Sequence, residues 1–200
     1  MNLGVLASGT GTNLQALLDT VHGTEAHVAA VASDKSDAPA LERARARDVP
    51  TRVFGRSDFP DRVARDAAMA DWLVEQGVEI VVLAGYMQLL SPGFLTRFPD
   101  RVVNVHPALL PAFPGIDAVA QALAYGVKVS GVTVHLVDEG VDTGPILLQE
   151  AIAVDGIADR DALHARLRPL EHRLLPEAVR LLARGAVRRD PANPRRLLIS

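Results

Sequence analysis

Two polar side chains interrupt an apolar run in the segment VVNVHPALLP, residues 102–111. Asn104 and His106 stand two residues apart, and Pro107 then ends the run. Because successive residues of a strand alternate between its faces, the amide and the imidazole share one face at the end of the predicted strand. An amide donor and an imidazole that exchanges protons near neutral pH suit an oxygen that develops negative charge. The alternative is a hydrogen-bonded pair that only ends the strand.

A carboxylate stands in the segment VDEGVDTGP, residues 137–145, which predicts a loop between two strands. Asp142 lies there between two glycines, which permit backbone conformations that other residues avoid. A carboxylate placed against an imidazole orients the ring and favours its protonated form. We therefore expect Asp142 to complete a catalytic set with Asn104 and His106.

Other groups of chemical interest are few. His135, in TVHLV, is either a core histidine at a strand end or a group behind the site. The chain has no Cys, and its histidines form no H-x-x-x-H pair, so neither a thiolate nucleophile nor a metal site is expected. Since no serine has G-x-S-x-G context either, the pattern favours direct transfer between two bound substrates.

A glycine-rich loop, ASGTGTNL at residues 7–14, follows the first predicted strand and opens a helix. Gly9 and Gly11 permit a tight turn, and the free N–H groups at the helix start favour an anion. Leu14 stands where a dinucleotide fingerprint needs its third glycine, and Gly-Lys-Ser/Thr is absent. The loop therefore suits a phosphate. The alternative is a plain glycine turn with a polar residue capping the helix.

The elements that must position these groups alternate between strand and helix. Strands are predicted at 3–7, 27–33, 51–54, 79–85 and 101–106, and helices at 13–21, 38–48, 60–77 and 117–126. This order predicts an α/β fold with one doubly wound, mostly parallel Rossmann-like sheet and helices on both faces. In such sheets the site lies beyond the carboxyl ends of the strands, where the loops named above begin.

The pattern changes in the second half. The runs 129–138 and 144–154 predict an antiparallel strand pair, and 159–185 predicts a long C-terminal helix that Pro169 and Pro176 break or kink. The Arg-rich stretch 188–196 is expected to be a solvated turn.

Length and composition fit a small enzyme. The 200 residues are predicted to form a single domain over 1–185 with a C-terminal tail at 186–200. A net charge of −3 gives no sign of a nucleic acid or membrane partner. No apolar run approaches the roughly 18 residues of a membrane span, and the N-terminus has no signal-peptide pattern. We expect a cytoplasmic protein that acts on small molecules as a monomer or homodimer.

Four segments are familiar: VLASGTGTNLQALLD, VVLAGYMQLLSP, NVHPALLPAFPG and GVTVHLVDEGVDTGPILLQ. In order and without large gaps, the chain from residue 2 to about 185 closely resembles the phosphoribosylglycinamide formyltransferases, a folate-dependent family of purine synthesis. The resemblance implies that a glycinamide amine attacks the formyl carbon of 10-formyltetrahydrofolate, the co-substrate, without a metal. A tetrahedral intermediate forms and tetrahydrofolate leaves.

The resemblance also implies roles for the polar groups described above. His106 matches the family's proton donor, Asn104 the residue that holds the formyl oxygen, and Asp142 the carboxylate that raises the pKa of the histidine. The matches to the phosphoribosylglycinamide site are Gly11, Thr12, Asn13 and Glu171. The matches to folate contacts are Asn104, Arg62, Met87, Gln88, Leu89 and Leu90, of which the 87–90 stretch acts mainly through its backbone.

The sequence departs from the family at two places. Arg168 and Pro169 beside Glu171 are not the expected neighbours. Many members carry His after the Pro-Gly of the PAFPG loop, whereas this chain has PGIDAVAQAL, and we expect Asp117 to cap the next helix.

Several rival functions fit parts of the pattern. Formyl transfer to methionyl-tRNA or to an amino sugar uses the same scaffold, but the tRNA enzymes carry an added C-terminal domain. A hydrolase that releases formate would be expected to carry an N-terminal regulatory domain. A nicotinamide-dependent oxidoreductase could use Asp34 on a ribose, but the missing third glycine argues against it. A folate- or nucleotide-binding module without activity would not need an imidazole and a carboxylate together.

Overall fold

The computed structural model describes residues 1–157 and 159–200, which group into two compact units, 1–104 and 105–200. The chain passes from unit 1 to unit 2 inside strand β5 (Val102–His106), after Asn104. The predicted boundary between domain and tail at residue 185 remains a prediction.

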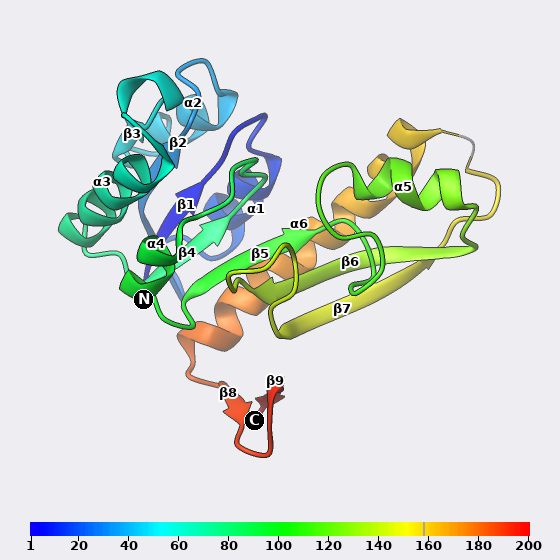
Figure 1. Ribbon diagram of the computed structural model, residues 1–200. Helices are drawn as coiled ribbons and strands as arrows, with labels where there is room; N and C mark the ends of the chain where they lie inside the picture. The colour runs from blue at the N-terminus through cyan, green and yellow to red at the C-terminus, as the bar shows by residue number, and fades with distance from the viewer. Residues whose placement is uncertain (158) are drawn as a thin grey trace. The chain divides into compact units, whose positions relative to one another are not determined.

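Unit 1 is a parallel sheet with helices on both faces (Figure 1). Its strands are β1 (Asn2–Leu6), β2 (His27–Ser33), β3 (Thr51–Val53), β4 (Ile80–Leu83) and the first part of β5, in the order β3-β2-β1-β4-β5. Its helices are α1 (Thr12–Thr20), α2 (Pro39–Arg45), the 3₁₀ turn η1 (Arg56–Asp58), α3 (Arg62–Glu75) and α4 (Pro92–Arg97).

The strand order of unit 1 explains its layers. The chain runs outward from β1 to β3, returns to β4, and continues to β5. Since such crossovers are right-handed, α1 and α2 cover one face while α3 and α4 cover the other. The contacts agree, because α1 packs on α2 and α3 packs on α4. Strand β4 is buried along its whole length, as a central parallel strand should be.

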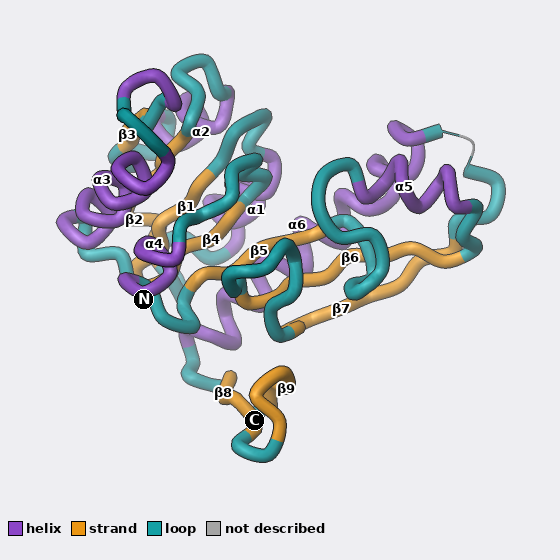
Figure 2. The backbone as a smooth tube through the Cα atoms, in the orientation of Figure 1, coloured by secondary structure: helices purple, strands orange, loops and turns teal. Residues whose placement is uncertain are grey.

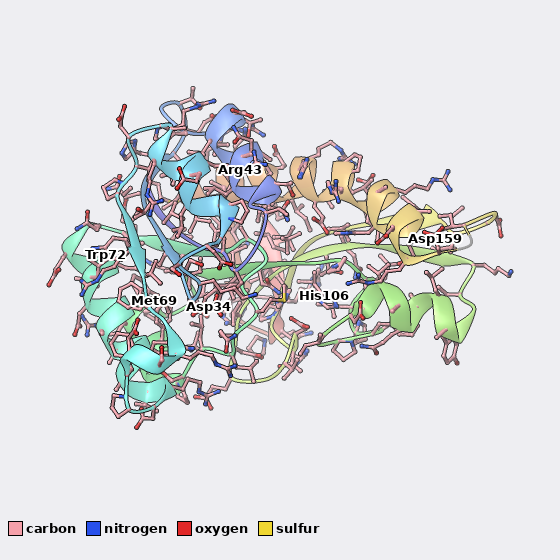
Figure 3. The ribbon with its side chains drawn as sticks, turned by 90° about the horizontal axis from the view of Figure 1, so that it is seen from above. Asp34, Arg43, Met69, Trp72, His106 and Asp159 are labelled. Carbon is pink, nitrogen blue, oxygen red and sulfur yellow. The ribbon has the colours of Figure 1, made fainter. Side chains whose placement is uncertain are left out.

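The core of unit 1 is aliphatic, with one aromatic group beside α3. Trp72 lies near Phe54, with ring centroids 5.7 Å apart, and both are buried. Met69, one turn earlier on α3, is fully buried as well (Met69 and Trp72 are labelled in Figure 3). These side chains fix α3 on its sheet face, and with it the arginines at the start of the helix.

Unit 2 contains the antiparallel pair and the long helix that the sequence predicts. Its elements are α5 (Ala118–Tyr125), β6 (Val129–Leu136), β7 (Ile146–Ala153), α6 (Arg160–Ala183), β8 (Val187–Asp190) and β9 (Asn193–Ile199). Strand β6 pairs antiparallel with β7 along its length, and α6 packs against both. Three leucines spaced along α6, Leu163, Leu167 and Leu174, are buried. The predicted fold class is therefore confirmed.

Three local predictions for unit 2 are wrong. Helix α6 runs unbroken through Pro169 and Pro176, because packing of its apolar face outweighs the missing backbone hydrogen bonds. Asp117 is the N-cap residue of α5, but its side chain makes no cap; it accepts instead from Arg160 Nε at 2.7 Å. The stretch 188–196 lies in two strands, β8 and β9, joined by a tight turn (Figure 2).

Candidate active site

His106 and Asp142 lie together in unit 2. His106 ends β5 and is buried, while Asp142 lies in the loop between β6 and β7. Nδ1 of His106 is 3.3 Å from Oδ2 of Asp142, an ion-pair distance. That same Oδ2 accepts from the N–H of Gly115 at 2.7 Å. The carboxylate therefore fixes the imidazole and the following loop at once.

A second imidazole faces the other oxygen of the carboxylate. Nε2 of His135, on β6, is 3.4 Å from Oδ1 of Asp142, and its Nδ1 is 2.8 Å from the carbonyl oxygen of Leu136. Carbonyl and carboxylate oxygens only accept hydrogen bonds, so both ring nitrogens of His135 face acceptors. The His135 side chain is 1% exposed. Sequence reasoning left the role of His135 open, and no local motif separates it from a core histidine.

The same surroundings set the protonation of Asp142. Burial raises the pKa of a carboxyl, but hydrogen bonds from His135 and from the Gly115 N–H, together with the nearby charges of the two imidazoles, outweigh burial. The pKa of Asp142 is therefore held below its ordinary value. Asp142 is an anion across the physiological range and acts as an electrostatic partner for both rings.

The second nitrogen of His106 is occupied by its own chain. Nε2 donates to the carbonyl oxygen of Phe113 at 2.8 Å. Phe113 has φ 54°, in the left-handed region that non-glycine residues rarely adopt, and its ring lies edge-on to Tyr125. The proton on Nε2 reaches another acceptor only when the Phe113 carbonyl gives way.

The exit from β5 is fixed by hydrogen bonds from the antiparallel pair. Thr133 Oγ1 donates to the Ala108 carbonyl at 2.6 Å and accepts from the Leu110 N–H at 3.1 Å. Gln149 Nε2 donates to the Leu110 carbonyl at 2.8 Å. These bonds tie the segment after His106 to β6 and β7, so its path does not depend on the prolines alone.

Asn104 precedes His106 by two residues on β5 and is half-buried. It lies opposite Leu83 in the parallel pairing of β4 and β5. The period of two places its side chain on the same face of the strand as His106. Asn104 remains a candidate for the group that holds a developing oxyanion.

The glycine loop lies in unit 1 and is held by α2. Gly11 is the N-cap of α1 with φ 71°, and a Cβ there would lie 2.7 Å from the Cα of Ala40. Arg43 Nε donates to the Thr10 carbonyl at 2.8 Å (Arg43 is labelled in Figure 3). The N-cap residue is a glycine and offers no side chain to cap the helix. Thr12 and Asn13 open the helix and stay, with Gly11, a candidate phosphate site.

The segment after β4 is anchored by one residue from the loop after β1, one from the loop after β2 and one from α3. Ser8 Oγ accepts from the Met87 N–H at 2.9 Å, and Asp34 Oδ2 accepts from Gln88 Nε2 at 3.0 Å. Asp66 Oδ2, fully buried on α3, accepts from the Ser91 N–H at 2.7 Å. Sequence reasoning missed the anchoring role of all three, since each acts across a long stretch of chain.

Between these anchors, the candidate folate segment presents its apolar side chains outward. The side chains of Met87 and Leu89 are largely exposed, 62% and 56%. Their exposure beside an anchored backbone is typical of a surface that a flat ligand covers. Gln88 and Leu90 lie in the same segment, and all four residues remain candidates for folate contacts.

Arg62, the first residue of α3, lines a pocket of about 180 Å³ in unit 1. The other lining residues are Arg56, Phe59, Pro60, Asp61, Arg65 and Gln88. Arg65 is committed to Asp66 through Nε and Nη2, at 3.1 and 2.8 Å, in a buried ion pair. The exposed Arg62 makes no ion pair with any residue the structure describes, so its guanidinium stays available to a carboxylate.

Glu171 lies on α6 in unit 2 and is only 5% exposed. Its Oε1 is 3.9 Å from Nε2 of His164, which lies about two helical turns earlier on the same face of the helix. A buried carboxylate of this kind suits a cationic or amide N–H donor, and Glu171 remains a candidate substrate contact.

The described residues form neither a metal-binding cluster nor a membrane-spanning helix. No group of three or more His, Cys, Asp or Glu side chains there is arranged to hold a metal ion. Among the same residues, no helix is long and apolar enough to cross a membrane.

Comparison with known proteins was decisive for the family. Residues 1–179 match the family model described as formyl transferase. The chain belongs to the formyl transferase family. Its members include a phosphoribosylglycinamide formyltransferase of Mycobacterium tuberculosis (strain CDC 1551 / Oshkosh), 49% identical over 186 residues, which are 92% of this chain and 86% of that one.

Solved structures of the formyl transferase family agree. Glycinamide ribonucleotide transformylase 1 from Symbiobacterium toebii matches 100% of this chain and 93% of its own, with a TM-score of 0.94 and 47% identity. Glycinamide ribonucleotide transformylase 1 from Geobacillus kaustophilus matches 91% of this chain and 98% of its own, with a TM-score of 0.87 and 41% identity. Residues 180–200, which include β8 and β9, lie outside the part that the family model matches.

Proposed function

We propose that this protein transfers the formyl group of 10-formyltetrahydrofolate to the amine of 5-phosphoribosylglycinamide. The products are N-formylglycinamide ribonucleotide and tetrahydrofolate, in de novo purine synthesis. The observation that carries the proposal is the strand-end imidazole of His106, held by the half-buried carboxylate of Asp142 in a chain whose relatives bear this activity in their names. Small-molecule substrates and a cytoplasmic location belong to the same proposal.

The proposed reaction needs positioning and proton management. The glycinamide nitrogen attacks the formyl carbon, and the carbonyl oxygen becomes an oxyanion in a tetrahedral intermediate. The amine loses a proton as the C–N bond to the folate nitrogen breaks, and that nitrogen gains one. Asn104 donates to the oxyanion, and the N–H of His106 stabilises the same charge and supplies a proton. Asp142 keeps the imidazole oriented.

Binding roles follow from the candidate residues. Amides at the start of α1, with Thr12 and Asn13, receive the phosphate of the ribotide. Glu171 accepts from the glycinamide group. Arg62 pairs with a carboxylate of the folate's glutamyl tail, and the backbone of 87–90 receives its ring.

The proposal requires a local rearrangement. Nε2 of His106 donates to the Phe113 carbonyl, so the proposed reaction requires that carbonyl to move before the proton is delivered. The displaced segment keeps its link to the carboxylate through the Gly115 N–H.

A direct assay tests the function. Purified protein supplied with both substrates is expected to produce tetrahydrofolate and the formylated ribotide in equal amounts. Two control reactions omit the ribotide, to detect formate release, or replace it with methionyl-tRNA. Failure to form the ribotide product with both substrates present would overturn the proposal, and formate release alone would indicate a hydrolase.

The role of His106 has its own test. His106→Ala is expected to lower kcat by about 10²–10⁴-fold while KM for each substrate changes little, because the lost group acts in the transition state. His27→Gln, an exposed histidine of unit 1, is the control and should keep native kinetics. A His106→Ala enzyme with native kcat would refute the proton-donor role.

A further inference from the structure

The C-terminal hairpin formed by β8 and β9 reaches the loop that carries Asp142. Strand β9 pairs antiparallel with β8 and parallel with β7, where Arg196 lies opposite Ile146. The 138–144 loop precedes Ile146, at the start of β7. The hairpin therefore continues the strands of unit 2 next to the base of this loop.

One side chain of the hairpin makes the contact. Nη2 of Arg195 donates to the carbonyl oxygen of Thr143 at 2.8 Å. Thr143 directly follows Asp142, so the guanidinium holds a peptide group next to the carboxylate that faces both imidazoles. A hydrogen bond from a charged donor is stronger and more directional than one from water.

The neighbouring Arg196 binds within the hairpin. Arg196 forms an ion pair with Asp190 at 3.7 Å, within the hairpin. Adjacent residues of a strand point to opposite faces of the sheet. Arg195 and Arg196 therefore have different partners: Arg195 binds the Thr143 carbonyl, and Arg196 pairs with Asp190. The contact to Thr143 is therefore specific to one position and is not a general property of a basic tail.

The loop needs such a restraint because its backbone is unusual. Asp142 has φ 53°, in the left-handed region, which a non-glycine residue keeps only where its surroundings hold it. On its other side, Thr143 Oγ1 and the Gly140 N–H both donate to Oδ1 of Asp138, at 2.6 and 3.1 Å. The Asp138 bonds hold the loop from within, and Arg195 holds it from outside.

We propose that Arg195 is a positioning residue for the formyl transfer, acting through the Thr143 carbonyl to keep Asp142 beside His106 and His135. The C-terminal hairpin thereby becomes part of the catalytic apparatus, although it lies outside the part matched by the family model. This inference rests on the proposed function for its kinetic readout and on geometry alone for its spectroscopic one.

The test compares Arg195→Gln with Arg188→Gln in the full-length protein. Arg188 lies on β8, is exposed, and has no side-chain partner among the residues the structure describes, so its substitution removes the same charge from the same hairpin. Arg195→Gln is expected to lower kcat by about 3- to 10-fold with KM for both substrates within about twofold, and to shift the pH profile of kcat. Arg195→Lys, which keeps a charged donor, should restore part of the rate.

A measurement independent of activity separates this proposal from the proposed function. The ring-proton NMR signals of His106 and His135 in the unliganded protein should move in Arg195→Gln and stay in place in Arg188→Gln. Thermal unfolding of both variants detects any general loss of folding. If Arg195→Gln does not fold, Arg195→Lys replaces it in the comparison. If both imidazole signals and kcat are native in Arg195→Gln, the positioning role is refuted. If the wild-type protein has no transferase activity, the proposed function fails and the NMR comparison alone decides on Arg195.

Discussion

Nε2 of His135 lies 3.4 Å from Oδ1 of Asp142, while the other oxygen of the same carboxylate faces Nδ1 of His106 at 3.3 Å. One half-buried carboxylate is thus shared by two imidazoles. Because Nδ1 of His135 is already committed to the Leu136 carbonyl, the ring is fixed at both nitrogens. His135 therefore orients the carboxylate, while the other nitrogen of His106 donates to the Phe113 carbonyl.

Replacing His135 tests this arrangement. His135→Gln is expected to lower kcat by about tenfold, equivalent to about 1.4 kcal/mol, because Asp142 loses its contact with Nε2 of the imidazole. The loss should be smaller than for His106→Ala, since His135 acts only through Asp142. Steady-state kinetics measures the change, with His27→Gln as the control. A kcat equal to that of the wild type would show that His135 is only a core residue.

Asp142 makes stability depend on pH. Its pKa is lowered from 3.8, so the ionised carboxylate stabilises the folded state at every pH above about 3.8, and this contribution disappears as the pH falls through the folded-state value. Asp142→Asn is therefore expected to cost about 1.5–3 kcal/mol at about pH 5.5, with the difference from wild type shrinking toward pH 3.5 and below. Urea unfolding at a series of pH values measures it. A difference that grows on acidification would contradict the assigned sign.

The buried pair of Arg65 and Asp66 has an exposed counterpart in the same unit. Arg65 and Asp66 are 3% and 0% exposed, whereas Arg97 and Asp71 form a pair at 46% and 57%. Asp66→Asn should destabilise unit 1 by about 3–5 kcal/mol, because it leaves a buried guanidinium without its anion.

Asp71→Asn is the matched control for the buried pair and should cost at most about 1 kcal/mol, since solvent screens exposed charges. Where Asp66→Asn remains folded, KM for the folate should rise, because Asp66 also holds the Ser91 N–H at the end of the candidate folate segment. Equal unfolding midpoints in urea for the two variants would argue against a structural role for the buried pair.

Gly144 is required by packing. A Cβ at this position would lie 1.8 Å from the carbonyl oxygen of Leu136, a distance that forces the loop away from β6. Gly144→Ala is expected to destabilise the protein by more than about 3 kcal/mol and to lower kcat, because Asp142 moves with the loop. Gly93→Ala is the control: a Cβ there meets no atom closer than 4.0 Å and lies inside α4, so stability should stay within about 1 kcal/mol of wild type. Similar unfolding curves for the two variants would contradict the packing argument.

The sequence alone determined the α/β fold class, most of its elements, and the residues at which to look for chemistry. The spacing of apolar residues and the glycines between elements are local properties of the sequence. They therefore predicted the bounds of β2, the antiparallel pair and α6 to within about two residues. Strand alternation placed Asn104 and His106 on one face, and the glycines around Asp142 marked its loop as unusual. The short α4 and the turn η1 were missed because each is too short to show a period.

Only the tertiary structure decided what depends on contacts between distant residues. Two prolines predicted a break in α6, but packing against β6 and β7 carries the helix through them. The pairing of His135 with Asp142, and of Arg195 with Thr143, joins residues that no local pattern connects. A sequence states which donors and acceptors exist and how they alternate, while the free energy of burying them selects their partners, and that free energy is set by the whole fold.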